Sequence, residues 1–283
     1  ADRDEALPFS ESVPGPSTDR LSELCRKHHL YVVFGLLERD QRSEFLYNSA
    51  ALVGPDGYIG KYRKTHLFFT DTRWAVGGDA RFSCFDLPFG RVGIMVCMDV
   101  SFFETARIAT LSGAQILAFP LNSRMPAPSD EWRVRAAENG VYLLASNRTG
   151  FERGTRFTGG SAIIAPDGSI VKSLGNEPGA VVAEIDTSLC GRDVWGFGRP
   201  LADRRPDTYY PLLLNPYDWP ATESHGLVSE GVPWIVANPA RGDFDTVRQK
   251  CETVWRDFRS VQGVRPDLMV LPEKAVSKRQ RDE

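Results

Sequence analysis

The chain has 283 residues, with 34 Lys and Arg against 37 Asp and Glu, which gives a net charge of −3 at neutral pH. Apolar residues make up 42% of it and charged residues 25%, which excludes a wholly disordered or fibrous protein. The charge balance disfavours nucleic acid and membrane partners, and the apolar runs fall far short of the roughly 18 residues that a spanning helix needs. We expect a cytoplasmic protein of one large domain or two small ones.

Short apolar runs of the kind that form buried strands alternate with helix-like stretches. In chain order, the predicted elements are helix Ser17–Lys27, strand Leu30–Leu37, strand Val92–Cys97, helix Phe103–Ser112, strand Gln115–Pro120, helix Asp130–Asn139, strand Val141–Ser146, strand Trp234–Ala237, helix Asp243–Gln262 and strand Asp267–Leu271. The strand runs are rich in Leu or β-branched residues, as expected where both faces of a sheet are covered. This alternation predicts an α/β layered fold.

Two Pro-Asp-Gly turns lie between strand-like arms, at Pro55–Gly57 and Pro166–Gly168. Such turns predict β-hairpins. Hairpins beside helix-covered strands favour two stacked sheets with helices outside over one doubly wound sheet. From Gly196 to Gly231 the chain is rich in Pro and Tyr without a sustained period, which is typical of an extended arm and a linker.

The five cysteines are widely spaced and form no C-x-x-C pair, so neither a disulfide framework nor a zinc site is expected. Cys97 differs from the others because it ends a predicted strand and precedes a predicted helix. A nucleophile at such a turn is exposed, and the N–H groups of the helix start favour a thiolate and an oxyanion. Taken alone, however, a strand cysteine is more often a buried structural residue.

Two charged residues also lie at predicted strand ends: Lys64 follows the first hairpin, and Glu273 closes the last apolar run. A lysine beside a thiolate can lower the pKa of the thiol and hold an oxyanion, and a desolvated carboxylate can act as a general base. In isolation, each is more often a solvated charge at a sheet edge. His66 could instead pair with Cys97 in the manner of thiol proteases, although no Asn or Asp pattern supports that arrangement.

Three segments that carry these residues occur together, Asp267–Glu273, Gly60–Leu67 and Gly93–Glu104. As a set they resemble the motifs of the carbon–nitrogen hydrolase (nitrilase) superfamily. The resemblance implies a four-layer αββα sandwich with a catalytic triad of Glu273, Lys64 and Cys97 and no metal or organic cofactor. It also implies that Glu138 lies near Lys64 and holds it in place. The resemblance covers about residues 14–210 and 232–273.

The chain departs from the family pattern in the loop after Lys64 and in the cysteine motif. Where the family commonly has a second Glu, this chain has Thr72, with Asp71 beside it as the candidate substitute. The polarity around Lys64 and Cys97 depends on whether Asp71 compensates. Phe103 replaces the usual Pro of the cysteine motif, which bears on how the following helix starts.

The order of the segments also differs, because the Glu273 segment comes last here and first in the family. A circularly permuted domain explains this order: residues 1–222 and 231–283 form one domain, and 223–230 joins the family's usual termini. A slice of a tandem array is the alternative. The near-complete, non-duplicated coverage favours permutation, and under either explanation we expect Glu273 to dock beside Lys64 and Cys97.

The resemblance implies a hydrolase that cleaves a small linear amide or N-carbamoyl compound through a thioester on Cys97. Glu273 takes the thiol proton and later activates water, while Lys64 and the backbone N–H of Met98 hold the oxyanion. The Cys97-Met98-Asp99 sequence resembles the amidase and carbamoylase branches more than true nitrilases.

Two alternatives remain at this point: hydrolysis of a nitrile, and a catalytically silent binding or assembly module on the same fold. The family also implies at least a homodimer, with the aromatic arm Arg199–Pro220 wrapping a neighbouring subunit.

Overall fold

The computed structural model describes residues 2–78, 83–191, 201–213, 234–236, 249, 252–253, 256 and 268–270. The chain divides into two units, Ala1–Arg204 and Arg205–Glu283, which are described separately. Within the described residues, no helix combines the length and the apolar character needed to cross a membrane.

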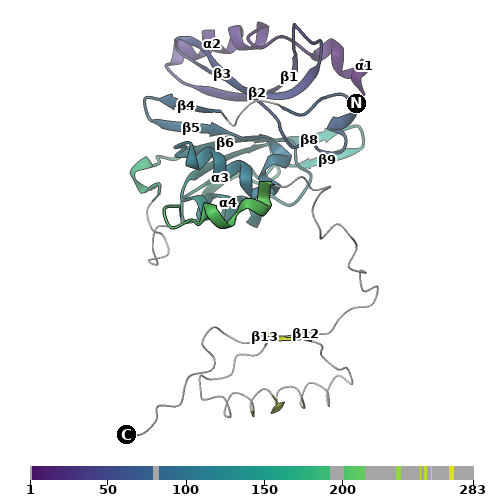
Figure 1. Ribbon diagram of the computed structural model, residues 1–283. Coiled ribbons are helices and arrows are strands. Elements are labelled where there is room, and N and C mark those ends of the chain that lie inside the picture. The colour runs from purple at the N-terminus through teal and green to yellow at the C-terminus, as the bar shows by residue number, and fades with distance from the viewer. Residues whose placement is uncertain are drawn as a thin grey trace. The chain divides into compact units, whose positions relative to one another are not determined.

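A three-stranded antiparallel sheet forms one inner layer of the first unit, under helix α2 (Pro16–His28) (Figure 1). Its strands run in the order β1-β2-β3, with the bounds Val32–Arg39, Leu46–Gly54 and Gly57–Arg63. The β2–β3 turn places Gly57 at φ 113, a backbone conformation that favours glycine. The first Pro-Asp-Gly hairpin is therefore confirmed. A short helix, α1 (Arg3–Ala6), precedes α2.

A six-stranded sheet forms the second inner layer, in the order β11-β10-β7-β6-β5-β4. Its strands are β4 (Cys84–Leu87), β5 (Gly90–Ile94), β6 (Ile116–Leu121), β7 (Tyr142–Asn147), β10 (Ala162–Ile164) and β11 (Ile170–Ser173). The central strands β5, β6 and β7 are parallel, and the outer strands pair antiparallel. The outer helices α3 (Phe103–Leu111) and α4 (Asp130–Asn139) cover its far face (Figure 1). A separate hairpin pairs β8 (Thr149–Glu152) with β9 (Thr155–Thr158).

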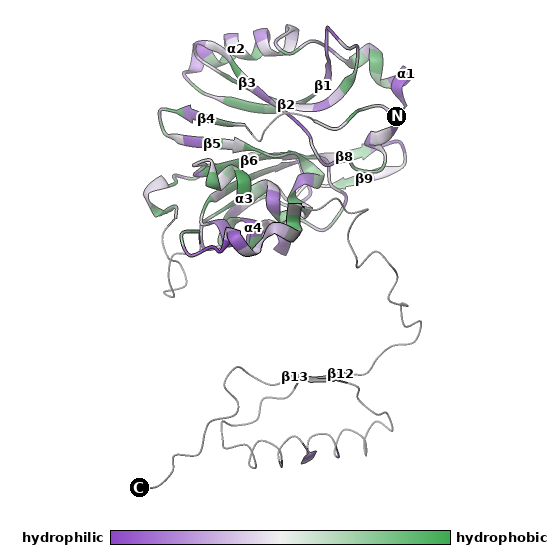
Figure 2. Cartoon of the chain, viewed as in Figure 1, coloured by the Kyte–Doolittle hydropathy of each residue, from purple (hydrophilic) through white to green (hydrophobic). Residues whose placement is uncertain are grey.

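Two apolar cores lie on the two sides of the six-stranded sheet. One lies between the sheets and includes Ala50, Leu52 and Ile94. The other lies between the six-stranded sheet and its helices, where the rings of Phe119 and Trp132 meet edge to face at 5.7 Å. Figure 2 shows the hydrophobic colouring concentrated on the inner strands. The α/β αββα architecture predicted from the sequence is present in this unit.

The region around Cys97 differs from the prediction. The strand β5 ends at Ile94, three residues early, and a 3₁₀ turn, Cys97–Ser101, separates it from α3. A strand cannot continue through Cys97 because its φ is 46, in the left-handed region. Helix α3 nevertheless begins at Phe103, the residue that replaces the family's Pro. The substitution therefore leaves a helix start in place.

The second unit contains a parallel strand pair, β12 (Trp234–Val236) with β13 (Leu268–Val270). Both strands were predicted from their apolar runs. Within the predicted helix between them, the described residues Gln249, Glu252, Thr253 and Arg256 are helical. Glu273 and the proposed linker 223–230 lie outside the described residues.

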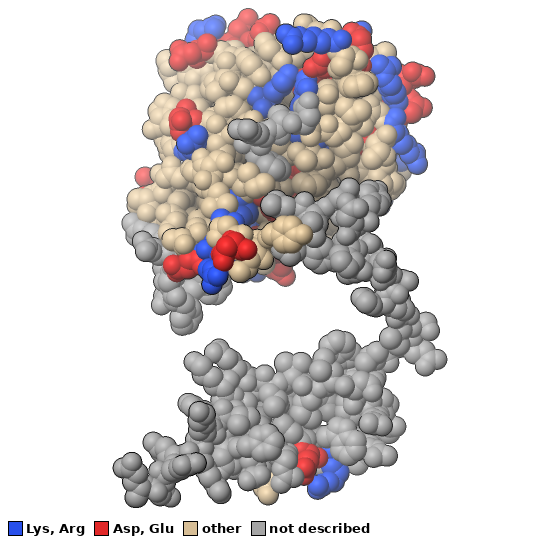
Figure 3. Space-filling model, in the orientation of Figure 1, with Lys and Arg blue, Asp and Glu red and all other residues tan. Residues whose placement is uncertain are grey.

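The surface reflects the balanced charge of the sequence. On the face that Figure 3 shows, Lys and Arg are interspersed with Asp and Glu around the rim of the first unit, and much of its middle is uncharged.

Candidate active site

Cys97 occupies a strained turn at the carboxyl end of β5. Its φ of 46 is unusual for a residue with a side chain, and such outliers gather at functional sites. Cys97 is half-buried and packs against both apolar cores, so it stands where the two sheets meet the helical layer. Met98, which follows it in the 3₁₀ turn, is also half-buried.

Lys64 is a fully buried lysine at the end of β3. Its side chain is 1% exposed, and its Nζ lies 2.5 Å from Oδ2 of Asp71. Its backbone is held on both sides: its N–H donates to the Asn48 carbonyl at 2.8 Å, and its carbonyl accepts from the Gly78 N–H at 2.9 Å. A buried ammonium needs a paired counter-charge, and here the carboxylate of Asp71 supplies it.

Asp71 supplies the carboxylate that forms an ion pair with Lys64, and Thr72 is not part of this pair. Oδ2 of Asp71 also accepts from the Asn48 side-chain amide and from the Phe68 N–H, both at 3.3 Å. The Thr72 side chain is exposed, and its hydroxyl donates to the Phe69 carbonyl. The substitution noted at Thr72 therefore leaves Lys64 with an acidic partner.

A second buried carboxylate, Asp99, joins the Cys97 turn to the Lys64 segment. Its Oδ2 accepts from the Val96 N–H at 2.8 Å and from the Tyr62 hydroxyl at 3.0 Å. Its Oδ1 accepts from the His66 N–H at 3.0 Å. Burial, together with the nearby charge of Asp99, raises the pKa of Tyr62, so that hydroxyl remains a donor.

His66 faces Asp99 with its ring. Nδ1 lies 2.9 Å from Oδ1 of Asp99 and 3.5 Å from the Thr105 hydroxyl, and the ring stacks on Phe102 with centroids 3.8 Å apart. These contacts make His66 a partner of Asp99. The Cys97–His66 pairing considered from the sequence is not among the contacts of the described residues.

A family model described as carbon-nitrogen hydrolase matches residues 1–193, more than half of the chain. The chain belongs to the carbon-nitrogen hydrolase family. The family resemblance inferred from the motifs is therefore confirmed, and this carbon-nitrogen hydrolase is an enzyme of the nitrilase superfamily with the α/β fold of its relatives.

Two relatives illustrate the range of its family. A nitrilase of Pyrococcus abyssi is 38% identical over 211 residues, which cover 74% of this chain and 80% of the relative. The human omega-amidase NIT2 is 32% identical over 193 residues, which cover 63% of this chain and 69% of the relative. The names of these proteins span both nitriles and amides.

Solved structures give the same family and fold. An amidase from Nesterenkonia sp. superposes with a TM-score of 0.62 at 26% identity, over 69% of this chain and 72% of that one. A carbon-nitrogen hydrolase from Helicobacter pylori G27 gives 0.64 at 28% identity, over 70% and 76%. In a mutant of the Nesterenkonia amidase, acrylamide has added to the active-site cysteine.

Of the other predicted site residues in this carbon-nitrogen hydrolase, Glu138 is described and Glu273 is not. Glu138 lies on α4, where its Oε1 pairs with Arg135 at 2.9 Å and its carbonyl accepts from Arg107 at 2.9 Å. Arg135 also donates to the Val100 carbonyl in the turn after Cys97, at 2.8 Å. Through Arg135, Glu138 is thus linked to Val100 in the turn that begins at Cys97. Its predicted role beside Lys64 stays a prediction.

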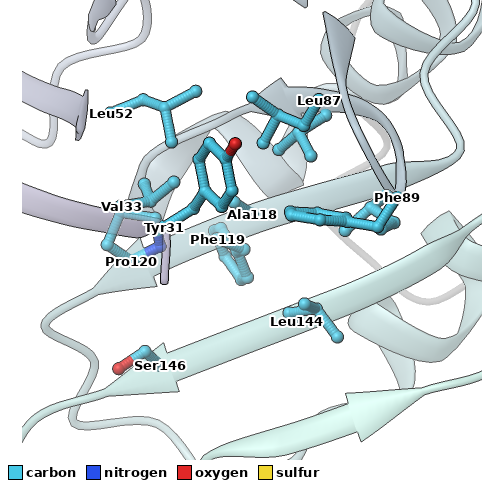
Figure 4. A pocket seen from close by; sticks show the side chains of 12 residues that line it. Tyr31, Val33, Leu52, Leu87, Phe89, Ala118, Phe119, Pro120, Leu144 and Ser146 are labelled. Carbon is cyan, nitrogen blue, oxygen red and sulfur yellow. The ribbon is translucent and has the colours of Figure 1, made fainter. Parts of the chain in front are cut away.

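An apolar cavity of about 250 Å³ lies between the two sheets of the hydrolase (Figure 4). Its walls come from both sheets: Tyr31, Val33, Leu52, Leu87, Phe89, Val92, Ile116, Ala118, Phe119, Pro120, Leu144 and Ser146. Neither Cys97 nor Lys64 lines it. The cavity therefore includes neither of these two predicted site residues. Among the described residues, no group of three or more His, Cys, Asp or Glu side chains could hold a metal ion.

Sequence reasoning missed Asp99 as the residue that connects the two segments. The sequence did hold a signal. Asp99 follows Cys97 by two residues, and its partners Tyr62 and His66 each lie two residues from Lys64. Only the fold shows that these three side chains meet, since the Lys64 and Cys97 segments come from different sheets.

Proposed function

We propose that this enzyme hydrolyses a small linear amide or N-carbamoyl compound through a thioester on Cys97. The observation that carries the proposal is the cluster in which one buried carboxylate, Asp99, ties the Cys97 turn to the segment of the buried Lys64. A half-buried thiol suits acyl transfer when a fixed cationic donor acts with it, and Lys64 is the proposed donor. Glu273 is the proposed general base.

Acylation begins when Glu273 takes the proton from the Cys97 thiol. The thiolate attacks the carbonyl carbon, and the C=O electron pair moves onto oxygen. The Lys64 ammonium and the Met98 N–H stabilise this oxyanion, and Asp71 pairs with the ammonium and orients it. As the intermediate collapses, the C–N bond breaks and the leaving nitrogen takes the proton from Glu273, so ammonia or an amine departs.

Deacylation repeats the same steps with water. Glu273 takes a proton from the attacking water, and the same donors hold the second oxyanion. The C–S bond then breaks, the acid leaves, and the proton returns to the Cys97 sulfur. All of the acid–base and electrostatic roles are filled by groups of this chain.

Amide chemistry is favoured by the resemblance of Cys97-Met98-Asp99 to the amidase branch and by the relatives named amidase and omega-amidase. The relative named nitrilase supports nitrile hydrolysis as the second candidate. A matched panel of amides, N-carbamoyl compounds and nitriles with the same acyl groups separates the two. We expect ammonia or amine release from the amide or carbamoyl members, and release from nitriles alone would contradict the proposal.

Trapping tests the covalent step. The native enzyme is mixed with an amide that it hydrolyses and is then quenched rapidly with acid. Mass spectrometry of the intact chain and of its peptides should find the acyl group on Cys97. Cys97→Ala should give neither adduct nor turnover, whereas Cys84→Ala, a substitution at a half-buried cysteine of β4, should keep both. No adduct and no turnover in the native enzyme would favour the silent-module alternative.

A further inference from the structure

Asp99 is a fully buried acid for which the proposed acyl-transfer steps have no use. Both of its oxygens are occupied, Oδ2 by the Val96 N–H and the Tyr62 hydroxyl, and Oδ1 by the His66 N–H with the His66 ring nitrogen at 2.9 Å. One donor directly precedes Cys97, and the others flank Lys64 in the sequence.

We propose that Asp99 is a positioning residue that holds Cys97 and Lys64 in a fixed relative geometry. The inference rests on the proposed function, because it takes Cys97 and Lys64 to act on the same carbonyl group. Asp99 itself touches neither the substrate nor the sulfur in this scheme.

Within the turn, Asp99 stabilises the strained conformation of the nucleophile. A non-glycine residue in the left-handed region costs about 1–2 kcal/mol, and Cys97 has a φ of 46. The Asp99 side chain accepts from the Val96 N–H at 2.8 Å, and its own N–H donates to the Val96 carbonyl at 3.1 Å. These two bonds close a ring around Cys97 and Met98, which fixes the backbone N–H proposed for the oxyanion.

Asp99 also holds the segment of Lys64 against the turn of Cys97. Tyr62 and His66 each lie two residues from Lys64, so bonds from Asp99 to both sides of Lys64 leave its backbone little freedom. Oxyanion donors work only when they are aimed at the reacting oxygen, and a misplacement of about 1 Å can cost roughly 10²-fold in rate.

A side chain with two acceptor oxygens suits this position, because donors surround both oxygens of Asp99. Asp99 presents two acceptor oxygens to backbone N–H groups of Val96 and His66 and to one hydroxyl. An asparagine offers one acceptor oxygen and places an NH₂ group against donors, so at least one buried N–H loses its partner.

The first test compares Asp99→Asn with the native chain. We expect kcat per titrated Cys97 thiol to fall about 10²-fold with KM within about threefold, because the groups that bind the substrate remain while the alignment is lost. The matched control is Thr18→Ala, which removes two hydrogen bonds of a fully buried residue on α2. It should lower the melting temperature without changing kcat.

A milder variant covers the case in which Asp99→Asn does not fold. Tyr62→Phe removes one donor to Asp99 and keeps the ring, so it should lower kcat less, roughly 3–10-fold, with KM unchanged. If Asp99→Asn or Tyr62→Phe lowers only the melting temperature, as Thr18→Ala does, the positioning role is overturned and Asp99 is a structural acid.

A further readout is independent of amide turnover. The rate of iodoacetamide modification at Cys97, followed by peptide mass spectrometry across pH, reports the thiolate and its cationic neighbour. We expect the pH profile of the rate to change in Asp99→Asn, because Lys64 is no longer held in its native position relative to the thiol, and to stay unmoved in Thr18→Ala. An enzyme that modifies normally but hydrolyses no amide contradicts the proposed function, whereas an unmoved profile in Asp99→Asn contradicts the role of Asp99.

Discussion

Lys64 depends on a side chain, Asp71, that lies outside the lysine motif Gly60–Leu67. The motif predicts the lysine, but the counter-charge that a buried lysine needs comes from Asp71, whose carboxylate lies 2.5 Å from Nζ. The family resemblance places the second Glu of the family at Thr72, one residue after Asp71. The short 3₁₀ turn Asp71–Arg73 determines which of the two faces the lysine, and that turn has no reliable sequence signature.

Asp71→Asn should therefore impair both stability and catalysis. The buried ammonium of Lys64 loses its counter-charge, so we expect a lower melting temperature and a fall in kcat/KM of about 10²-fold, comparable to the loss of an oxyanion donor. Thermal unfolding and steady-state kinetics on the best amide of the panel measure the two effects.

The neighbouring Thr72→Ala provides the control. Its side chain is exposed and bonds only to the local backbone at Phe69 among the contacts described, so we expect stability within about 0.5 kcal/mol of the native chain and unchanged kinetics. Equal effects of Asp71→Asn and Thr72→Ala would show that the acid is not needed at Lys64.

At the scale of elements, the order of strands and helices was predictable and their ends were not. Apolar runs located β6 and β7, and the Pro-Asp-Gly turns located both hairpins, because these signals are local. The predicted end of β5 was wrong by three residues. The left-handed backbone at Cys97 lies in a turn that Asp99 closes through Val96. Asp99 is itself held by Tyr62 and His66 from a distant segment, so no local propensity revealed this backbone.

The outer face of the three-stranded sheet carries a buried ion network that no local pattern revealed. Glu38 on β1 accepts from Lys61 at 2.5 Å and from Ser49 at 2.7 Å, and it also pairs with Arg63, the residue before Lys64. Burial raises the pKa of Glu38, but hydrogen bonds from Arg63 and Lys61 outweigh it, and the net pKa is lowered. The network therefore ties the end of β3 to β1.

This network predicts part of the acid sensitivity of the fold. Because the pKa of Glu38 is lower in the folded chain, its stabilisation is present above the unfolded value, about 4.3, and is lost as the pH falls through the folded value. Glu38→Gln should cost about 3–5 kcal/mol at pH 7 and flatten the dependence of unfolding free energy on pH below about 4.5.

Denaturant unfolding between pH 7 and pH 3 measures this change. Glu44→Gln is the matched control, because Glu44 pairs with Arg39 at an exposed position and such pairs contribute about 0–1 kcal/mol. If Glu38→Gln and Glu44→Gln have the same small effect, the network contributes little to stability.

At the scale of the whole molecule, the proposed mechanism needs a general base from the Glu273 segment. We propose that residues 1–222 and 231–283 form one circularly permuted domain and that Glu273 serves the Cys97 of its own chain. The support is the non-duplicated set of family motifs in this sequence, together with the strands β12 and β13 in the predicted Glu273 segment and its neighbour. A tandem arrangement would instead bring a base from another repeat or another copy.

Complementation between inactive variants separates these arrangements. Glu273→Gln should lower kcat by about 10²–10⁴-fold, the usual contribution of a general base, while Glu177→Gln, at an exposed position, should have no effect. Because each chain is expected to use its own base, co-expressing Glu273→Gln with Cys97→Ala should leave activity at the background of the single variants. Recovery toward a quarter of native activity would mean that the base comes from another copy. A fully active Glu273→Gln would remove Glu273 from the mechanism and leave the proposed roles of Cys97 and Lys64 in place.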